Sequence, residues 1–96
     1  MTGPVISPRA RADLDEIWDH TKANWGDAQA ESYLRDIGAA FGRIAADPRC
    51  GQDWGHIRAG YRRYTVGAHV IFYRMRGSVV DVVRILHARM DFNRHL

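Results

Sequence analysis

The sequence predicts an α+β domain of order β-α-α-β-β-β, in which an N-terminal strand and a helical hairpin pack on one face of a small antiparallel sheet. Two stretches with apolar residues at 3.6-residue spacing come first, and three stretches typical of β-strands follow them. The breaks between those three stretches are short and contain glycine, as expected for hairpins. The 96 residues are expected to form a single domain, 1–96.

The first helix is expected to follow a short strand at Val5-Ile6. Ser7-Pro8 has the pattern of an N-cap and a proline at the first helical position, where the missing N–H is not needed. Gly26 should end this helix and Asp27 should cap the next one, so the two helices fold back as a hairpin. The expected apolar stripe is Ala10, Leu14, Ile17, Trp18 and Trp25, with Thr21 among them.

The second helix is expected to end at Asp47-Pro48, because a residue before proline avoids the helical conformation. After a loop, strands are expected over 57–66, 69–76 and 79–87. The stripe of the second helix is Ala30, Leu34, Ile37, Phe41 and Ile44, flanked by Tyr33 and Ala45.

The strand over 69–76 predicts two different sheet faces, because successive side chains point to opposite sides. The row expected in the core is His69, Ile71, Tyr73 and Met75. The row expected on the other, open face is Val70, Phe72, Arg74 and Arg76. Apolar residues ringed by cations suit an acidic amphipathic partner segment. The alternative is that residues 88–96 fold back over this face.

Charge is divided unevenly along the chain, whose formal net charge is +3. Residues 1–53 hold six Lys/Arg and nine Asp/Glu, whereas residues 54–96 hold eight Arg and two Asp. Such a basic region meets acidic protein segments or nucleic acid, unless the arginines only solvate a sheet face. Cys50 is the only cysteine, which excludes an internal disulfide. Without a signal sequence or a membrane-length apolar run, the expected location is cytoplasmic, with no membrane association.

Neither a metal nor a cofactor is expected. The five histidines are scattered without zinc-ligand spacing, and no glycine-rich phosphate loop joins a strand to a helix. The acidic residues Asp13, Asp15 and Glu16 lie near a helix start, where carboxylates favour the helix dipole.

The end of the last strand, Arg84 to Arg89, holds the remaining candidate for chemistry. A metal-free ribonuclease would use His87, Arg84 and Arg58, but it needs a second proton-transfer group. No tyrosine is a convincing second proton-transfer group, but Tyr61, Tyr64 and Tyr73 are not excluded from that role. The favoured interpretation is that Arg84 and His87 are polar strand-end residues that bind backbone or a carboxylate.

Residues spread over nearly the whole chain resemble one known family, the ParE branch of the RelE/ParE toxin superfamily. Each fragment is weak alone, but their order and spacing are specific. The fragments are Ser7-Pro8-Arg9-Ala10 with Asp13-Leu14-Asp15-Glu16-Ile17-Trp18, Asn24-Trp25-Gly26 with Gln29-Ala30 and Tyr33, Asp47-Pro48 with Gly51, Ile57 to Arg63, Gly67 to Arg74, and Arg84-Ile85-Leu86-His87 with Met90-Asp91 and the terminal His95-Leu96.

The resemblance implies the toxin of a type II toxin–antitoxin module, a non-enzymatic inhibitor of DNA gyrase. It implies a hetero-oligomer with a ParD-like ribbon-helix-helix antitoxin, through which the toxin would contact operator DNA indirectly. The alternative is a RelE-like ribosome-dependent mRNA endoribonuclease, disfavoured because the basic sheet region has no lysine. The expected antitoxin- or target-binding residues are Arg58, Tyr61, Arg62, Arg63, Val70, Phe72, Arg74, Arg76, Arg84, His87 and Arg89.

Overall fold

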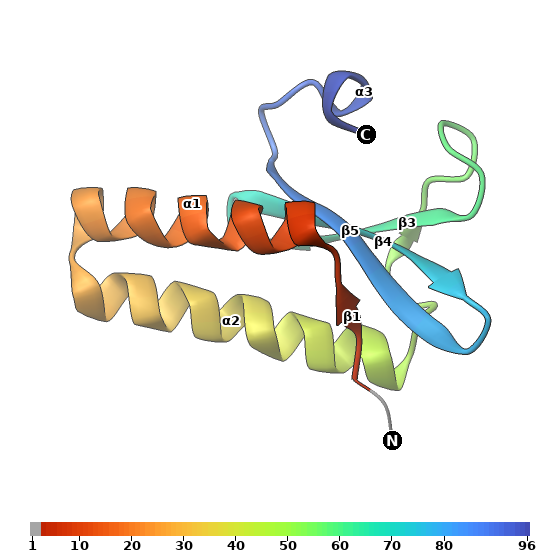
Figure 1. Cartoon of the computed structure of the whole chain (residues 1–96), viewed down its shortest axis with the longest axis horizontal. Helices are drawn as coiled ribbons and strands as arrows, with labels where there is room; N and C mark the ends of the chain where they lie inside the picture. The colour runs from red at the N-terminus through yellow and green to blue at the C-terminus, as the bar shows by residue number, and fades with distance from the viewer. Residues whose placement is uncertain (1–2) are drawn as a thin grey trace.

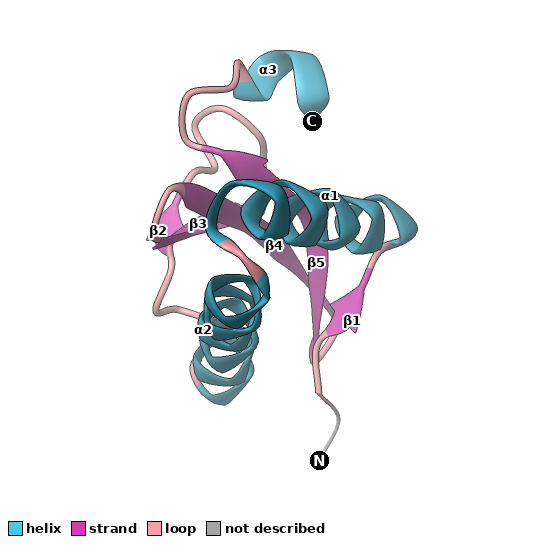
Figure 2. Cartoon of the chain, turned by 90° about the vertical axis from the view of Figure 1, so that its left-hand side faces the viewer, coloured by secondary structure: helices cyan, strands magenta, loops and turns pink. Residues whose placement is uncertain are grey.

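The computed structural model describes residues 3–96 and confirms the α+β fold class. Two long helices run side by side against a five-stranded sheet of order β1-β5-β4-β3-β2 (Figures 1 and 2). β1 pairs with β5 in parallel and all other pairs are antiparallel, so the sheet is mixed. The elements are β1 (Val5–Ile6), α1 (Pro8–Trp25), α2 (Asp27–Ala46), β2 (Gln52–Asp53), β3 (Tyr61–Val66), β4 (His69–Arg76), β5 (Val79–His87) and α3 (Phe92–His95).

The start of α1 also closes the sheet edge. The Ser7 hydroxyl accepts a hydrogen bond from the Ala10 amide at 3.0 Å, as the N-cap prediction requires. The same hydroxyl donates to the Val83 carbonyl at 2.7 Å, and the Ser7 amide donates to Val82 at 3.0 Å. Ser7 therefore joins the helix start to the side of β5 that pairs with β1.

One glycine serves both ends of the helical hairpin. Gly26 adopts φ 89°, a conformation that side-chain-bearing residues rarely take, and its amide donates to the Lys22 carbonyl at 2.9 Å. It also occupies the N-cap position of α2, so the prediction that Asp27 caps this helix was wrong. Asp27 is the first residue of α2 and makes no capping hydrogen bond.

The main core lies between the helices and the sheet and contains the predicted Ile17, Ile37, Ile71 and Tyr73. Trp25 was expected there but is 73% exposed. The tip of the hairpin extends past the end of the sheet, so the last turn of α1 has no strand beneath it (Figure 1).

A second apolar layer covers the opposite face of the sheet. Its buried members are Trp54, Val70, Phe72 and Leu86, and its partly buried members are Tyr61, Met90, Phe92 and Leu96. Ile71 and Tyr73 were thus assigned correctly to one face of β4 and Val70 and Phe72 to the other, whereas Met75, expected in the core, is 41% exposed. The prediction of an open face was wrong. Residues 88–96 fold back over it and leave Val70 and Phe72 with no exposed surface, which is the alternative interpretation. Burial of three apolar side chains of that segment provides the physical reason.

The region before β3 differs from the prediction of a strand over 57–66, because β3 begins only at Tyr61. Residues 54–60 form successive turns, in which the amides of Ile57 and Arg58 both donate to the Trp54 carbonyl at 3.1 Å. Gly60 adopts φ 81°, which interrupts an extended strand. Within residues 3–96, no helix is long and apolar enough to cross a membrane.

Candidate functional site

Arg84 lies at the centre of a buried network with Asp13. Its Nε and Nη2 donate to the two Asp13 carboxylate oxygens at 2.8 and 2.9 Å, a bidentate pair that raises the pKa of Arg84 above its ordinary value. The Ile85 amide donates to the same carboxylate at 2.9 Å. The side chains are only 16% and 8% exposed, so the pair is shielded from solvent. This confirms the interpretation of Arg84 as a strand-end residue that binds a carboxylate.

Three predicted site arginines contact the C-terminal segment. Arg84 Nη1 donates to the His95 carbonyl at 2.9 Å, and Arg58 Nη2 donates to the main-chain oxygen of Leu96. The guanidinium of Arg63 lies 5.3 Å from the centre of the Phe92 ring, within cation–π range. These arginines stabilise the cover over the second apolar layer.

The other predicted arginines of β3 and β4 leave part of their side chains exposed to solvent. Arg74 Nε is 3.3 Å and Arg76 Nε 3.9 Å from the same Asp81 oxygen. The Arg76 side chain is 70% exposed, against 41% for Arg74. Arg62 donates to the Gly51 carbonyl at 2.8 Å. The guanidinium groups of Arg58 and Arg74 each lie 5.9 Å from the centre of the Tyr61 ring.

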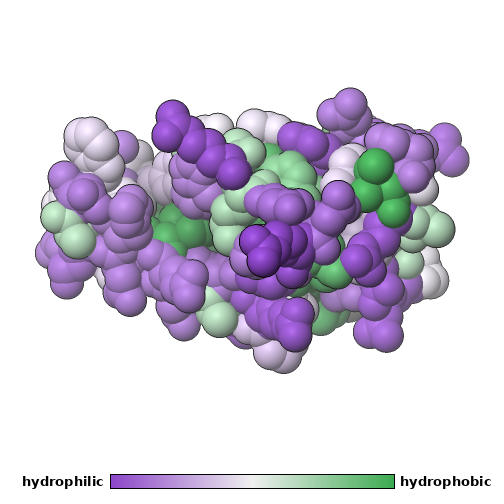
Figure 3. Space-filling model, turned by 90° about the horizontal axis from the view of Figure 1, so that it is seen from above, coloured by the Kyte–Doolittle hydropathy of each residue, from purple (hydrophilic) through white to green (hydrophobic). Residues whose placement is uncertain are grey.

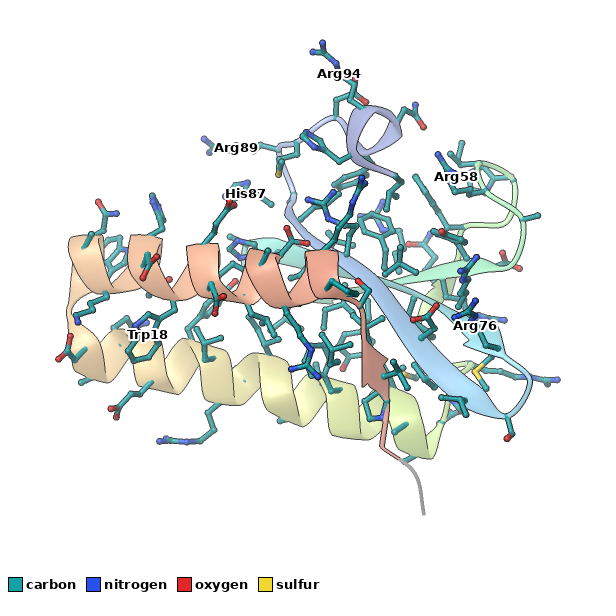
Figure 4. All side chains as sticks on the ribbon, viewed as in Figure 1. Trp18, Arg58, Arg76, His87, Arg89 and Arg94 are labelled. Atoms are coloured by element: carbon teal, nitrogen blue, oxygen red, sulfur yellow. The ribbon has the colours of Figure 1, made fainter. Side chains whose placement is uncertain are left out.

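Of the residues a ribonuclease would use, Arg84 and His87 line one cavity, and Arg84 and Arg58 bind the main-chain oxygens of two consecutive residues, His95 and Leu96. In Figure 4 His87 lies next to α1, and Arg58 lies by the turns before β3. Arg84 is held by Asp13 and His95. Arg89 and Arg94 project outward from the C-terminal segment in the same view, and Arg76 lies at the opposite end of the sheet (Figure 4).

A histidine cluster that the sequence did not reveal lies between the helical hairpin and the end of the sheet. The rings of His69 and His87 meet edge to face with centres 5.3 Å apart. Tyr33 Oη is 2.6 Å from His69 Nδ1, and the Arg89 amide donates to His87 Nδ1 at 3.1 Å. Burial, followed by the neighbouring His87 and His20, lowers the pKa of His69. The register His69↔His87 across β4 and β5 is the signal that would have shown this pair.

Two adjoining cavities of about 290 and 270 Å³ flank this cluster and share His20, Thr21, His69 and His87. The first extends toward Met90 and Arg84, and the second extends toward Trp25 at the hairpin tip. Seen from the side of α1 and α3, the surface is largely hydrophilic, with hydrophobic residues in a hollow to the left of the centre and at single places on the surface (Figure 3). Among residues 3–96 no group of three or more His, Cys, Asp or Glu is arranged to hold a metal ion.

Comparison with known proteins gives the family. Residues 5–92 match the family model described as the ParE toxin of the type II toxin–antitoxin system parDE. The chain belongs to the ParE toxin family. It is 50% identical over 93 residues to toxin ParE1 of Mycobacterium tuberculosis, covering 96% of this chain and 95% of that protein. It is 45% identical over 91 residues to toxin ParE1 of Caulobacter vibrioides, covering 95% and 94%.

A solved structure described as a chromosomal ParDE system from P. aeruginosa shares the fold of this ParE family member. The TM-score is 0.78, with 24% identity, over 91% of this chain and 96% of the other. The match to the family model extends from β1 through Phe92, the first residue of α3, and therefore includes the Asp13–Arg84 pair and both apolar layers except Leu96.

Proposed function

We propose that this member of the ParE family is the toxin of a ParDE module and inhibits DNA gyrase without catalysing a reaction. The observation that carries this choice over a ribonuclease is the position of Arg84. Its guanidinium is bound to the Asp13 carboxylate and to the His95 carbonyl, so it is not available to stabilise charge on a scissile phosphate. The Arg58 guanidinium is bound to the main-chain oxygen of the next residue, Leu96.

The experiment compares two targets with one preparation of purified toxin. We expect inhibition of gyrase supercoiling, and no cleavage of ribosome-bound mRNA at the same concentration. If mRNA were cut and supercoiling were unaffected, the gyrase proposal would fail. If the Arg84→Met variant is tested in the same assays, its folding must be measured as well, because this change also breaks the pair with Asp13.

One observation favours the ribonuclease as a second candidate. The His69 ring touches His87 and supplies the second proton-transfer group that the strand-end cluster otherwise lacks. The same mRNA assay addresses it: a ribonuclease should lose cleavage in His69→Gln and His87→Gln but keep it in His56→Gln, an exposed histidine outside the cluster.

A ParD-like ribbon-helix-helix antitoxin is the proposed partner, with an acidic segment bound to the arginines of β3 and β4 and an indirect contact with operator DNA. The family match supports this pairing, as does the shared fold with the P. aeruginosa structure, which is described as a ParDE system. We propose that the complex forms in the cytoplasm. Since Val70 and Phe72 are buried in the chain alone, the accessible part of this surface is formed by charged and aromatic side chains such as Tyr61, Arg63, Arg74 and Arg76.

Charge reversal at Arg76 tests that surface. Its side chain is 70% exposed and only loosely paired with Asp81, so Arg76→Glu should leave the fold intact and weaken antitoxin binding. Arg74 is a poorer choice because it also contacts Tyr61. Titration calorimetry should show at least about a tenfold weaker affinity, or about 1.4 kcal/mol. Arg35→Glu, at an exposed position of α2, is the matched control. Equal affinities of the two variants for the antitoxin would reject the arginines of β3 and β4 as its binding surface.

A further inference from the structure

We infer that residues 88–96 are a displaceable cover, and that an acidic amphipathic segment of the antitoxin takes their place on the second apolar layer. The inference rests on the antitoxin pairing proposed above and names the surface on which the two proteins meet. In the chain alone Val70 and Phe72 of this layer have no exposed surface. The layer is already occupied, by a segment whose charge does not match the arginines that contact it.

The cover is attached to the rest of the protein mainly by side chains. Within residues 3–96, no main-chain hydrogen bond joins residues 91–96 to another helix or strand. The hydrogen bonds that do so come from two side chains, Arg58 and Arg84, and end on main-chain oxygens of the segment. Figures 1 and 2 show α3 at the edge of the molecule, beyond the end of β5. The segment can therefore leave without breaking a strand pairing of the sheet.

The cover and the face beneath it carry charge of the same sign. Residues 88–96 contain two arginines and one aspartate, and the carboxylate of that aspartate caps α3. Arg58 and Arg63, which contact the segment, form no ion pair with an acidic side chain of residues 3–96. They contact a main-chain oxygen and an aromatic ring instead. A segment with carboxylates would pair both guanidinium groups and remove the repulsion between like charges.

The aromatic site under the cover defines the apolar part of the partner segment. The Phe92 ring meets Phe72 with ring centres 4.8 Å apart and Trp54 with centres 6.2 Å apart. Trp54 and Phe72 are buried, whereas Phe92 remains partly exposed. A partner helix that replaces the cover should therefore place an aromatic side chain where Phe92 lies, with carboxylates at neighbouring positions that reach the arginines.

Displacement makes antitoxin binding a competition with the cover. The partner binds only when the cover is open, so the observed affinity is the intrinsic affinity reduced by the fraction of open molecules. A substitution that weakens the cover alone should therefore strengthen partner binding. If the partner bound beside a closed cover, the same substitution would leave the affinity unchanged or weaken it, so the sign of the effect distinguishes the two arrangements.

Two peptides of opposite charge probe the surface. One is acetyl-Glu-Glu-Leu-Glu-Glu-Phe-Leu-Glu-Glu-Leu-amide, and the other has lysine in place of every glutamate. When the Glu peptide is titrated into the full chain, NMR should show a shift of the Trp54 indole signal. The amide signals of residues 92–96 should move to the positions typical of an unstructured chain. The Glu peptide should bind at least about tenfold more tightly than the Lys peptide, because the arginines gain charged partners.

Three variants test the competition. Phe92→Ala weakens the cover and should increase affinity for the Glu peptide at least about fivefold. Leu96→Ala should act in the same direction, and it keeps the test valid if Phe92→Ala fails to fold. Trp25→Ala is the control, because this aromatic side chain is 73% exposed at the hairpin tip, and it should not change the affinity.

Several results would overturn the inference. They are equal or weaker affinity for the Glu peptide in both cover variants, equal binding of the two peptides, no saturation by about 10 mM Glu peptide, or signals of residues 92–96 that stay in place at saturation. A purified ParD-like antitoxin separates the inference from the pairing. Antitoxin binding that leaves residues 92–96 in place would reject displacement and keep the pairing. No antitoxin binding, while the Glu peptide still displaces the cover, would reject the pairing and keep a cover that opens for an acidic segment.

Discussion

Removal of the charge on Asp13 is the sharpest test of how this fold is held together. Asp13 accepts two hydrogen bonds from Arg84 and one from the Ile85 amide, at 2.8, 2.9 and 2.9 Å, and the charged side chains of Arg84 and Asp13 are only 16% and 8% exposed. In Asp13→Asn the amide NH2 would face a guanidinium donor, and the buried Arg84 charge would lose its partner. Loss of one partner of a buried pair reduces stability by about 3–5 kcal/mol.

We expect a loss of about 3 kcal/mol for Asp13→Asn, near the lower limit, because the asparagine oxygen can still accept one hydrogen bond. For a domain of this size, that corresponds to a fall in Tm of roughly 12–24 °C. Equilibrium unfolding in urea measures it. The control is Asp15→Asn, a neighbouring exposed carboxylate on the same helix. A difference under about 0.5 kcal/mol between these variants would refute the reasoning, since surface substitutions vary by that amount.

A double substitution separates the interaction energy between Asp13 and Arg84 from the contributions of their other contacts. Asp13→Leu with Arg84→Met replaces two charges by apolar groups of similar length. An apolar replacement of a buried pair is often neutral, so the double variant should be more stable than the sum of the single losses predicts. The interaction energy should be at least about 1 kcal/mol.

Three further outcomes are expected. Gly51→Ala should reduce stability by about 1–3 kcal/mol in urea unfolding, because a Cβ at this position would overlap the hydroxyl of buried Tyr73, which accepts the Gly51 amide at 2.9 Å. The pKa of His69 is lowered in the folded chain, so His69 binds a proton more readily in the unfolded chain. The contribution of His69 to the free energy of unfolding is therefore complete above pH 6.5 and is lost as pH falls through the folded-state pKa. Urea midpoints measured between pH 7.5 and 5.5 should show this decline. Phe92→Ala should uncover the second apolar layer, reduce stability by about 1–3 kcal/mol and increase the fluorescence of a hydrophobic dye.

Each outcome has a control. Gly42→Ala, at an exposed position of α2, has no atom within 4 Å of its new Cβ and should be neutral or stabilising. Equal losses of stability in Gly42→Ala and Gly51→Ala would contradict the packing argument. The decline at low pH should be smaller in His69→Gln and unchanged in His56→Gln; the same decline in both would assign it to other groups. Unchanged dye fluorescence in Phe92→Ala would mean that residues 88–96 do not depend on this ring.

The helical hairpin and the three main strands could be predicted because local signals determine them. Ser7-Pro8 starts a helix, Gly26 ends it, and the two faces of β4 follow from alternation alone. The beginning of the strand at Ile57 could not be placed, since three apolar or charged residues before Gly60 fit a strand or a series of turns equally well. The two-residue strand β2 carries no period at all.

The site was predicted less well because its partners lie far apart in sequence. Asp13 was interpreted as an acid near a helix start, yet it falls between Ala10 and Ile17 on the buried stripe of α1. A carboxylate on an apolar stripe requires a buried cation, and that requirement was the missed signal. The identity of the cation, Arg84, depends on how β5 lies against α1, and no local pattern reports this.

The union of β1 and the start of α1 with β5 has a consequence for synthesis of the chain on the ribosome. Ser7 binds Val82 and Val83, and Asp13 binds Arg84 and Ile85, across some seventy residues of sequence. Helix α1 can form early, but it cannot pack in its final position against β5 until residues 79–87 have been translated. Long-range closure of this kind is slow. The nascent chain therefore stays unfinished for most of its translation, and the apolar side of α1 stays uncovered by β5 for as long.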